Sequence, residues 1–231
     1  MAADRLSERR RALPLGSGGA GRFRRQLRGP RLSGQDTSDP RLERAFALID
    51  EANARDPNTE PAGGRSEPRE LVYGRRMSAW LARLAPDASV ALQLAARAQH
   101  IERWTRPRGE YPMDRAGYHR WRGALAKFHA ERAGEILARS GFDPATIARV
   151  QALIRKERLA TDPETRMLED VVCLVFLENY FIDFAAKHAD DKVVDIVRKV
   201  WRKMSPEGQQ RALALDLPAG GRALIERALA H

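Results

Sequence analysis

From residue 39 onward, apolar residues recur at the three- and four-residue spacing of amphipathic helices. No stretch alternates like a strand over more than four residues, and no internal repeat is present. We therefore predict helices joined by short loops, with a longer loop over residues 56–68. The predicted helices are residues 40–54, 68–85, 87–103, 116–140, 144–159, 163–187, 191–204, 206–216 and 219–230.

Four of these helices open with a capping residue followed by proline. A capping oxygen accepts from the free amide donors of the first turn, and proline loses nothing there because its missing donor had no partner. These signals predict an all-α fold, a single compact multi-helix domain over residues 39–231. The four starts are Asp39-Pro40, Asp143-Pro144, Asp162-Pro163 and Ser205-Pro206.

Residues 1–38 are rich in Arg, Gly, Ser and Pro and have no sustained period, which predicts a disordered basic tail. Residues 1–41 hold ten Arg and four acids, so they contribute +6 of the net charge of +10. We expect weak nucleic-acid binding through this tail, and a dedicated nucleic-acid-binding arm is the alternative. The basic pI therefore says little about the domain.

Composition indicates the cellular compartment in which the protein is found. No apolar run reaches the roughly 18 uninterrupted residues of a membrane-spanning helix, and the first residues lack a secretory signal. The single cysteine, Cys173, lies in the most apolar run, as expected of a core residue in a reducing compartment. We expect a cytoplasmic protein without a membrane partner or an organic cofactor, and the sequence leaves the oligomeric state open.

Two acids, Glu169 and Asp170, stand at the start of the apolar stretch 168–186. Burying an unpaired charge costs several kcal/mol or more, so each acid needs a partner. Upstream, His129 shares a helix face with apolar residues, and His100 lies beside another such face. Two imidazoles and a carboxylate would form a metal site, so His100, His129 and Asp170 are the candidate ligands. The alternatives are satisfied core histidines and salt-bridged acids.

Arginine and aromatic residues surround the loop between the two histidine-bearing helices. Guanidinium groups bind phosphate through paired hydrogen bonds, and aromatic faces can stack on a base. A solvated basic loop whose aromatic residues cover the core is the alternative. The candidate ligand-binding residues are Arg97, Arg103, Arg115, Arg122, Trp104 and Tyr118, and the candidate catalytic residues are Glu169 and Lys156.

Several motifs together resemble one family, the domain of unknown function 4202, over roughly residues 42–218. The family is uncharacterised, so the resemblance implies little about activity. The motifs are Gln99–Trp104 (QHIERW), Tyr111–Tyr118 (YPMDRAGY), Trp121-Arg122, Phe128–Ala130 and Leu168–Leu177 (LEDVVCLVFL).

More distantly, the layout resembles the HD-domain superfamily of helical metal-dependent phosphohydrolases. That resemblance implies an HD-like fold, with His100 matching the histidine of the His-Asp doublet, His129 an intervening histidine and Asp170 the final aspartate. Other ligand positions differ, which implies a degenerate site. Ile101 replaces the doublet aspartate, Glu70, Tyr73 and Arg75 stand where the first histidine belongs, and Lys156 occupies a region that often carries another histidine.

These observations support a metal-dependent phosphohydrolase that uses a divalent metal ion and acts on a phosphorylated small molecule or nucleotide. The alternative is a non-catalytic helical module that binds a phosphate-bearing ligand or RNA through the arginine/aromatic loop. A protein-interaction domain is the third hypothesis. The first hypothesis requires the imidazoles of His100 and His129 and the carboxylate of Asp170 to lie within about 5 Å of one point, since metal bonds run about 2.0–2.3 Å.

Overall fold

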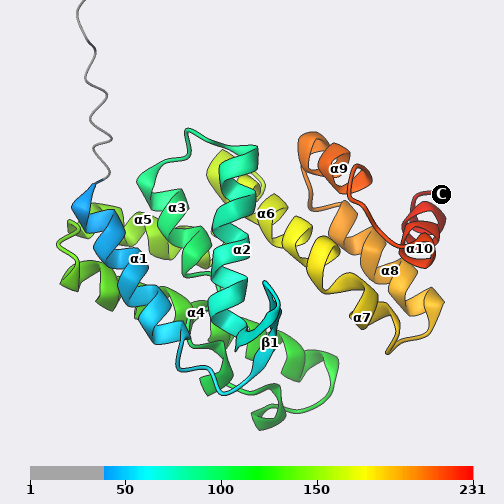
Figure 1. Ribbon diagram of the computed structural model, residues 1–231, viewed down its shortest axis with the longest axis horizontal. Coiled ribbons are helices and arrows are strands. Elements are labelled where there is room, and N and C mark those ends of the chain that lie inside the picture. The colour runs from blue at the N-terminus through cyan, green and yellow to red at the C-terminus, as the bar shows by residue number, and fades with distance from the viewer. Residues whose placement is uncertain (1–38, 231) are drawn as a thin grey trace, which may run out of the picture. The chain divides into compact units, whose positions relative to one another are not determined.

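A computed structural model describes residues 39–230, and the predicted basic tail, residues 1–38, lies outside this range. Within the described range the fold is helical, as predicted, and these residues belong to one compact unit (Figure 1). None of the described helices is both long enough and apolar enough to cross a membrane. The helices are α1 (Pro40–Asn53), α2 (Arg69–Leu84), α3 (Val90–Arg97), α4 (Arg115–Arg139), α5 (Pro144–Ile154), α6 (Pro163–Asn179), α7 (Phe181–Ala185), α8 (Asp190–Trp201), α9 (Pro206–Leu213) and α10 (Ala219–Leu229).

The four predicted helix starts are confirmed. Asp39, Asp143, Asp162 and Ser205 each occupy the capping position, and each side chain accepts a hydrogen bond from a backbone amide of the first turn. The proline that follows each cap occupies the first helical position, where its missing N–H leaves no bond unmade.

The core is organised around α6, which packs against α2, α3, α5, α7 and α9. Its residues Leu168, Val171, Leu174 and Val175 are completely buried, and Cys173 is a buried free thiol, as expected of a core residue. Helix α10 packs against both α7 and α8, while α9 contacts α6 directly. Figure 1 shows α8, α9 and α10 gathered beyond the middle of α6.

The predicted loop over residues 56–68 contains a small hairpin that the sequence pattern did not reveal. Strands β1 (Thr59–Ala62) and β2 (Arg65–Pro68) pair antiparallel around Gly63 and Gly64, which both have positive φ angles. A two-residue hairpin turn needs such angles, and glycine adopts them without strain. The strands are short and carry few apolar residues, so no alternation marks them. Glu60 fixes the hairpin by contacting Arg76 of α2 and Tyr180.

Three helices are shorter than predicted. The helix expected over residues 87–103 begins at Val90 and ends at Arg97, and the chain then runs through turns to a left-handed Glu102 with φ 51°. The helix over 144–159 ends at Ile154, followed by left-handed Lys156 and Arg158. The helix over 163–187 is interrupted at Tyr180, between α6 and α7. Apolar periodicity continued past α3 and α6 because Ile101 and Phe181, which follow them, are also buried in the core.

Candidate functional site

The two histidines singled out by the sequence lie together. His100 follows the end of α3, His129 lies in the middle of α4, and their ring centroids are 6.0 Å apart. His129 is 3% exposed, which confirms its predicted inward position. Its Nδ1 donates to the carbonyl oxygen of Ile101 at 2.8 Å. Because a carbonyl can only accept, this bond places the proton on Nδ1 and leaves Nε2 with a free lone pair. Nε2 is buried and has no hydrogen-bond partner among residues 39–230.

Helix α2 supplies two more polar groups to this site. The Tyr73 ring stacks on His100 with centroids 3.9 Å apart and planes 11° apart. Its hydroxyl is buried and finds no partner in the described part of the chain. Glu70 is 7% exposed, and its Oε2 lies 3.4 Å from Nδ1 of His100. Burial raises the pKa of Glu70 to about 7, with a smaller opposing effect from Arg103. This acid therefore changes charge near neutral pH.

Cations surround the two neutral imidazoles. Nη1 of Arg103 lies 3.2 Å from both ring nitrogens of His100, and the same guanidinium lies 5.2 Å over the Trp121 ring. Burial is the main cause that lowers the pKa of His100, and Arg103, Arg122 and Lys156 add to it. Burial likewise lowers the pKa of His129 to about 3, against the opposing effect of its bond to Ile101. Both rings are therefore uncharged at neutral pH, in a positive field.

The turn after His100 is held by contacts from two other helices. Asn53 at the end of α1 accepts from the amide of Glu102 at 2.9 Å, and Arg132 of α4 pairs with the Glu102 carboxylate at 2.6 Å. These bonds offset the left-handed backbone at Glu102, which costs about 1 kcal/mol or more in a residue with a Cβ. The strained turn directly follows Ile101, the acceptor that orients His129.

Asp170, the predicted metal-binding acid, is bound elsewhere. Its carboxylate accepts from the backbone amide and the hydroxyl of Ser205 at 2.8 and 2.6 Å, at the start of α9. A Cβ on Gly208 would lie 2.5 Å from the same carboxylate, so α9 approaches α6 closely here. Within residues 39–230, no group of three or more His, Cys, Asp or Glu side chains is placed to hold a metal ion. The set of His100, His129 and Asp170 is therefore not assembled as predicted.

The two candidate catalytic residues contact each other. Lys156 forms an ion pair with Glu169, and Lys203 lies 3.5 Å from the same carboxylate. Burial would raise the pKa of Glu169, but the two lysines hold it below its ordinary value. The negative charge of Glu169 is thus balanced by the two lysines. The charge of Lys156 also contributes to the lowered pKa of His100.

The predicted ligand-binding residues fall into three groups. Arg97 is engaged by Asp50 at 2.6 Å and by Ser78 at 3.2 Å, which makes it a structural link between α1, α2 and α3. Arg103 contacts His100 of the histidine pair. Trp104, the next residue in the chain, is half-buried. The remaining three, Arg115, Tyr118 and Arg122, are exposed on the first half of α4.

In the sequence, Glu70 and Tyr73 stand where HD-domain proteins carry their first histidine. Neither residue was predicted to belong to the site. The structure makes both of them part of the site. One feature of the sequence could have identified Glu70, because it is an acid on the apolar face of a helix. It shares that face with Tyr73 and Met77, and all three are buried.

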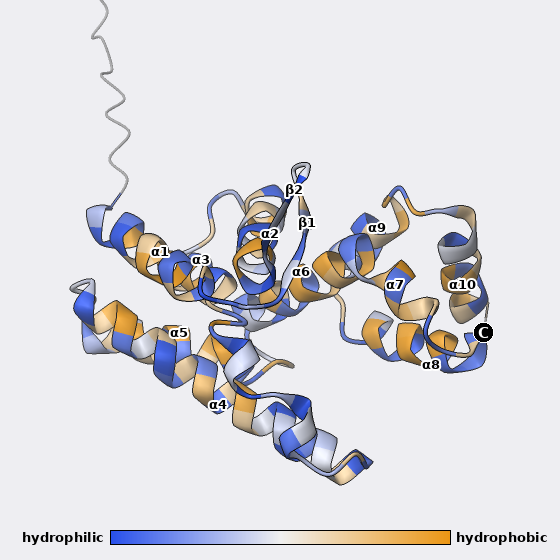
Figure 2. Ribbon diagram, turned by 60° about the horizontal axis from the view of Figure 1, so that its bottom comes forward, coloured by the Kyte–Doolittle hydropathy of each residue, from blue (hydrophilic) through white to orange (hydrophobic). Residues whose placement is uncertain are grey.

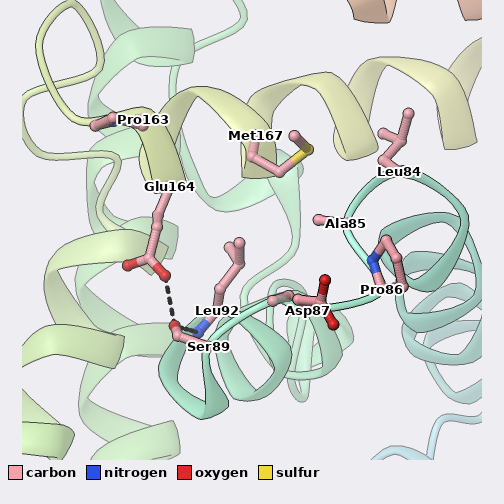
Figure 3. A pocket seen from close by; sticks show the side chains of 10 residues that line it. Leu84, Ala85, Pro86, Asp87, Ser89, Leu92, Pro163, Glu164 and Met167 are labelled. Carbon is pink, nitrogen blue, oxygen red and sulfur yellow. Dashed lines mark hydrogen bonds between the residues drawn. The ribbon is translucent and has the colours of Figure 1, made fainter.

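A separate surface pocket of about 460 Å³ lies where the end of α2 meets the starts of α3 and α6. Figure 3 shows its polar side, where Ser89 bonds to Glu164, opposite Leu84 and Met167. These polar groups satisfy each other, and none of the site residues described above lines the pocket. The pocket and the histidine site are therefore distinct.

Comparison with known proteins gives a family but no function. Residues 43–225 match the family model described as Domain of unknown function (DUF4202). No curated protein matches the chain, and no solved structure matches it. The distant resemblance to HD-domain hydrolases therefore stays a prediction. The family match covers most of the chain, and it spans α2, α3, α4 and α6, which carry or flank the histidine site. The chain belongs to the DUF4202 family.

Proposed function

We propose that the buried histidine pair and its neighbouring cations bind a phosphate-bearing small molecule. The observation that carries this proposal is the unsatisfied Nε2 of His129 in a positive field from Arg103 and Arg122. Neither arginine forms an ion pair with a carboxylate within residues 39–230, so their charges remain available to an anion.

The unsatisfied groups have complementary requirements. Nε2 of His129 accepts a hydrogen bond, whereas the Tyr73 hydroxyl and the arginines can donate. A singly protonated phosphate group, or a phosphorylated sugar, presents both anionic oxygens and a hydroxyl donor. A simple carboxylate presents acceptors only and would leave Nε2 unsatisfied, at a cost of about 1–3 kcal/mol.

The donor set fits a divalent metal ion poorly. Asp170 is held by Ser205, Glu169 is neutralised by lysines, and Arg103 places a positive charge beside His100. A tightly bound divalent ion generally needs three or more protein ligands. The metal-dependent phosphohydrolase therefore stays a prediction from the sequence. Its direct measurement is the metal content of tag-free protein, together with thermal shifts in Mn²⁺, Ni²⁺ and Zn²⁺.

The binding proposal is tested on the full chain by thermal shift and calorimetric titration. The probes are inorganic phosphate, ribose 5-phosphate and adenosine 5′-monophosphate, with unphosphorylated ribose and adenosine as controls. We expect at least one phosphorylated probe to bind, and its affinity to fall about tenfold or more in Arg103→Gln. Loss of one charge-assisted bond, about 1.5–3 kcal/mol, corresponds to this range.

Arg139→Gln is the matched control, because Arg139 is exposed near the end of the same helix, α4. It should bind the probe like the unaltered protein. The proposal fails if no phosphorylated probe binds, or if Arg103→Gln and Arg139→Gln bind equally well.

A further inference from the structure

The arginines between residues 103 and 122 differ from most others in the domain. Arg76, Arg97 and Arg149 illustrate the usual arrangement, since each is paired with an acid. None of the arginines at positions 103, 106, 108, 115, 120 and 122 pairs with a carboxylate within residues 39–230. Of the nearby acids, Glu102 pairs with Arg132, Asp114 caps α4, and the exposed Glu110 forms no ion pair with these arginines. The segment therefore keeps its positive charge.

Hydrogen bonds fix the backbone of this charged segment. Arg108 donates to the carbonyl oxygens of Tyr111 and Pro112 at 2.9 and 2.6 Å, and Trp121 donates to that of Arg106 at 2.9 Å. A Cβ on Gly117 would lie 2.0 Å from the Pro112 oxygen, so only glycine permits this approach of the loop to α4. Arg108, Gly117 and Trp121 thus hold the loop against α4, and the Arg106 guanidinium lies 5.0 Å over the Phe128 ring.

An exposed aromatic residue lies among these arginines. Arg115, Tyr118 and Arg122 share one side of α4, because residues three and four apart on a helix are neighbours. Tyr118 is 46% exposed, although a ring of this size usually buries most of its surface. Arg106 and Arg120 are exposed as well. Figure 2 shows hydrophilic colours over the first turns of α4 and the loop before it. Arg120 points about 160° away from Tyr118 around the helix, so we call Arg106, Arg115, Tyr118 and Arg122 the arginine face.

We infer that the arginine face binds single-stranded nucleic acid, with phosphates on the guanidinium groups and one base stacked on Tyr118. A positively charged surface with an exposed ring is the usual composition of such sites, and a stacked base contributes about 1–3 kcal/mol. In a duplex the bases are already stacked on each other, so the ring would gain nothing. An acidic peptide would use the charges but leave the ring without a partner.

This inference and the small-molecule proposal share one residue, Arg122, and otherwise rest on different side chains. It uses exposed side chains of α4 and its preceding loop, whereas the small-molecule site uses the buried Glu70, Tyr73 and His129 and the partly buried His100. The variants below leave those groups, Arg103 and Arg122 unchanged, so the two proposals can fail separately.

The experiment measures binding of a fluorescein-labelled 20-nucleotide oligouridylate to the full chain by fluorescence anisotropy, across a series of salt concentrations. We expect the double variant Arg106→Glu/Arg115→Glu to weaken binding about tenfold or more and to lower the salt dependence, since each lost phosphate contact reduces the slope by about 0.7. Arg115 is the first residue of α4, where glutamate is favoured by the helix dipole, so the helix should tolerate the change.

The matched control is Arg139→Glu/Arg222→Glu, which removes the same charge from exposed positions elsewhere and keeps the same basic tail. It should weaken binding less than about twofold. Tyr118→Ala should weaken binding about five- to tenfold, whereas Tyr118→Phe should keep it, because phenylalanine retains the stacking ring.

Four outcomes would overturn the inference. These are no binding by the unaltered protein, equal losses in the two double variants, equal affinity for a duplex of the same length, and an unchanged affinity in Tyr118→Ala. Equal losses would assign binding to overall charge. Unchanged affinity in Tyr118→Ala would leave a surface that binds polyanions without discrimination.

Discussion

Glu70 shows how one residue links the fold to the chemistry of the site. It lies on the buried face of α2, beside His100, and burial raises its pKa to about 7. An acid with an ordinary pKa would remain charged throughout the neutral range. Glu70 instead gains or loses its proton near neutral pH, so the charge of the histidine site depends on pH.

The raised pKa of Glu70 predicts a pH-dependent stability. Below its ordinary value of 4.5 the acid is neutral in both the folded and the unfolded chain. Between 4.5 and about 7 the unfolded chain releases the proton first, so the folded state loses stability as pH rises. At about 1.4 kcal/mol per pKa unit, the loss is about 3 kcal/mol.

Glu70→Gln should remove this loss. Urea unfolding at pH 5 and pH 8 should show the variant gaining about 2.5 kcal/mol relative to the unaltered protein between the two values. The exposed Glu226→Gln serves as control and should show no such gain. Identical pH dependence in the Glu70 variant and the unaltered protein would show that Glu70 titrates normally.

His129 and Asp170 mark the limit of reading single residues from a sequence. His129 lies on the apolar face of its helix, and the structure confirms that it is buried. Asp170 is buried as well, but its partner is Ser205 and not a histidine. A helical pattern indicates which face of a helix is buried. It does not indicate which neighbouring helix covers that face.

At the scale of elements, the junction of α6 and α9 depends on one buried carboxylate. Asp170 binds both the amide and the hydroxyl of Ser205, the residue that caps α9 through Gly208. Burial raises the pKa of Asp170, and the two bonds from Ser205 oppose that rise. The contact therefore orients the start of α9 against the central helix.

We predict that Asp170→Ala destabilises the protein by about 2–3 kcal/mol, because it removes two hydrogen bonds to a charged group and leaves the Ser205 amide unsatisfied. Urea unfolding measures the change, and Asp183→Ala at an exposed position of α7 is the control. Binding of the phosphorylated probe should be unchanged. A variant of normal stability that loses probe or metal binding would assign Asp170 to the site after all.

Two of the shortened helices, α3 and α5, are followed by turns with left-handed residues. Glu102, Lys156 and Arg158 adopt left-handed angles although none of them is glycine. At Glu102, two contacts made by distant residues offset the strain. Local propensity predicts a continuing helix at Glu102, and the distant partners Asn53 and Arg132 make the turn favourable.

At the scale of the whole molecule, burial is concentrated in the helices that flank the histidine site. Leu94, Ala95 and Ala96 of α3 are completely buried together with the inner face of α6. The hairpin β1–β2, in contrast, consists of exposed and partly buried residues. The stability of local segments should follow this distribution.

Hydrogen exchange of the native protein should therefore separate the two regions. We expect amides over residues 168–175 to exchange only through global unfolding, and amides over residues 60–67 to exchange several orders of magnitude faster. Mass spectrometry of peptic peptides at several times measures both. Comparable protection of the two segments would show that the hairpin is part of the core.

The sequence by itself determined the helical class, the four capped helix starts and the inward face of α4. Each of these follows from local rules: a repeat of 3.6 residues, an oxygen that satisfies free amides, and the cost of exposing apolar surface. The basic character of the segment before α4 was also evident from the residues alone.

Only the tertiary structure decided which polar groups meet. It joined Glu70 and Tyr73 to the histidine pair, assigned Asp170 to Ser205 and Glu169 to lysines, and left several arginines without acids. The physical reason is that a buried polar group must be satisfied by whatever lies beside it. The neighbours of that group are set by the packing of helices distant in the chain, which no local pattern encodes.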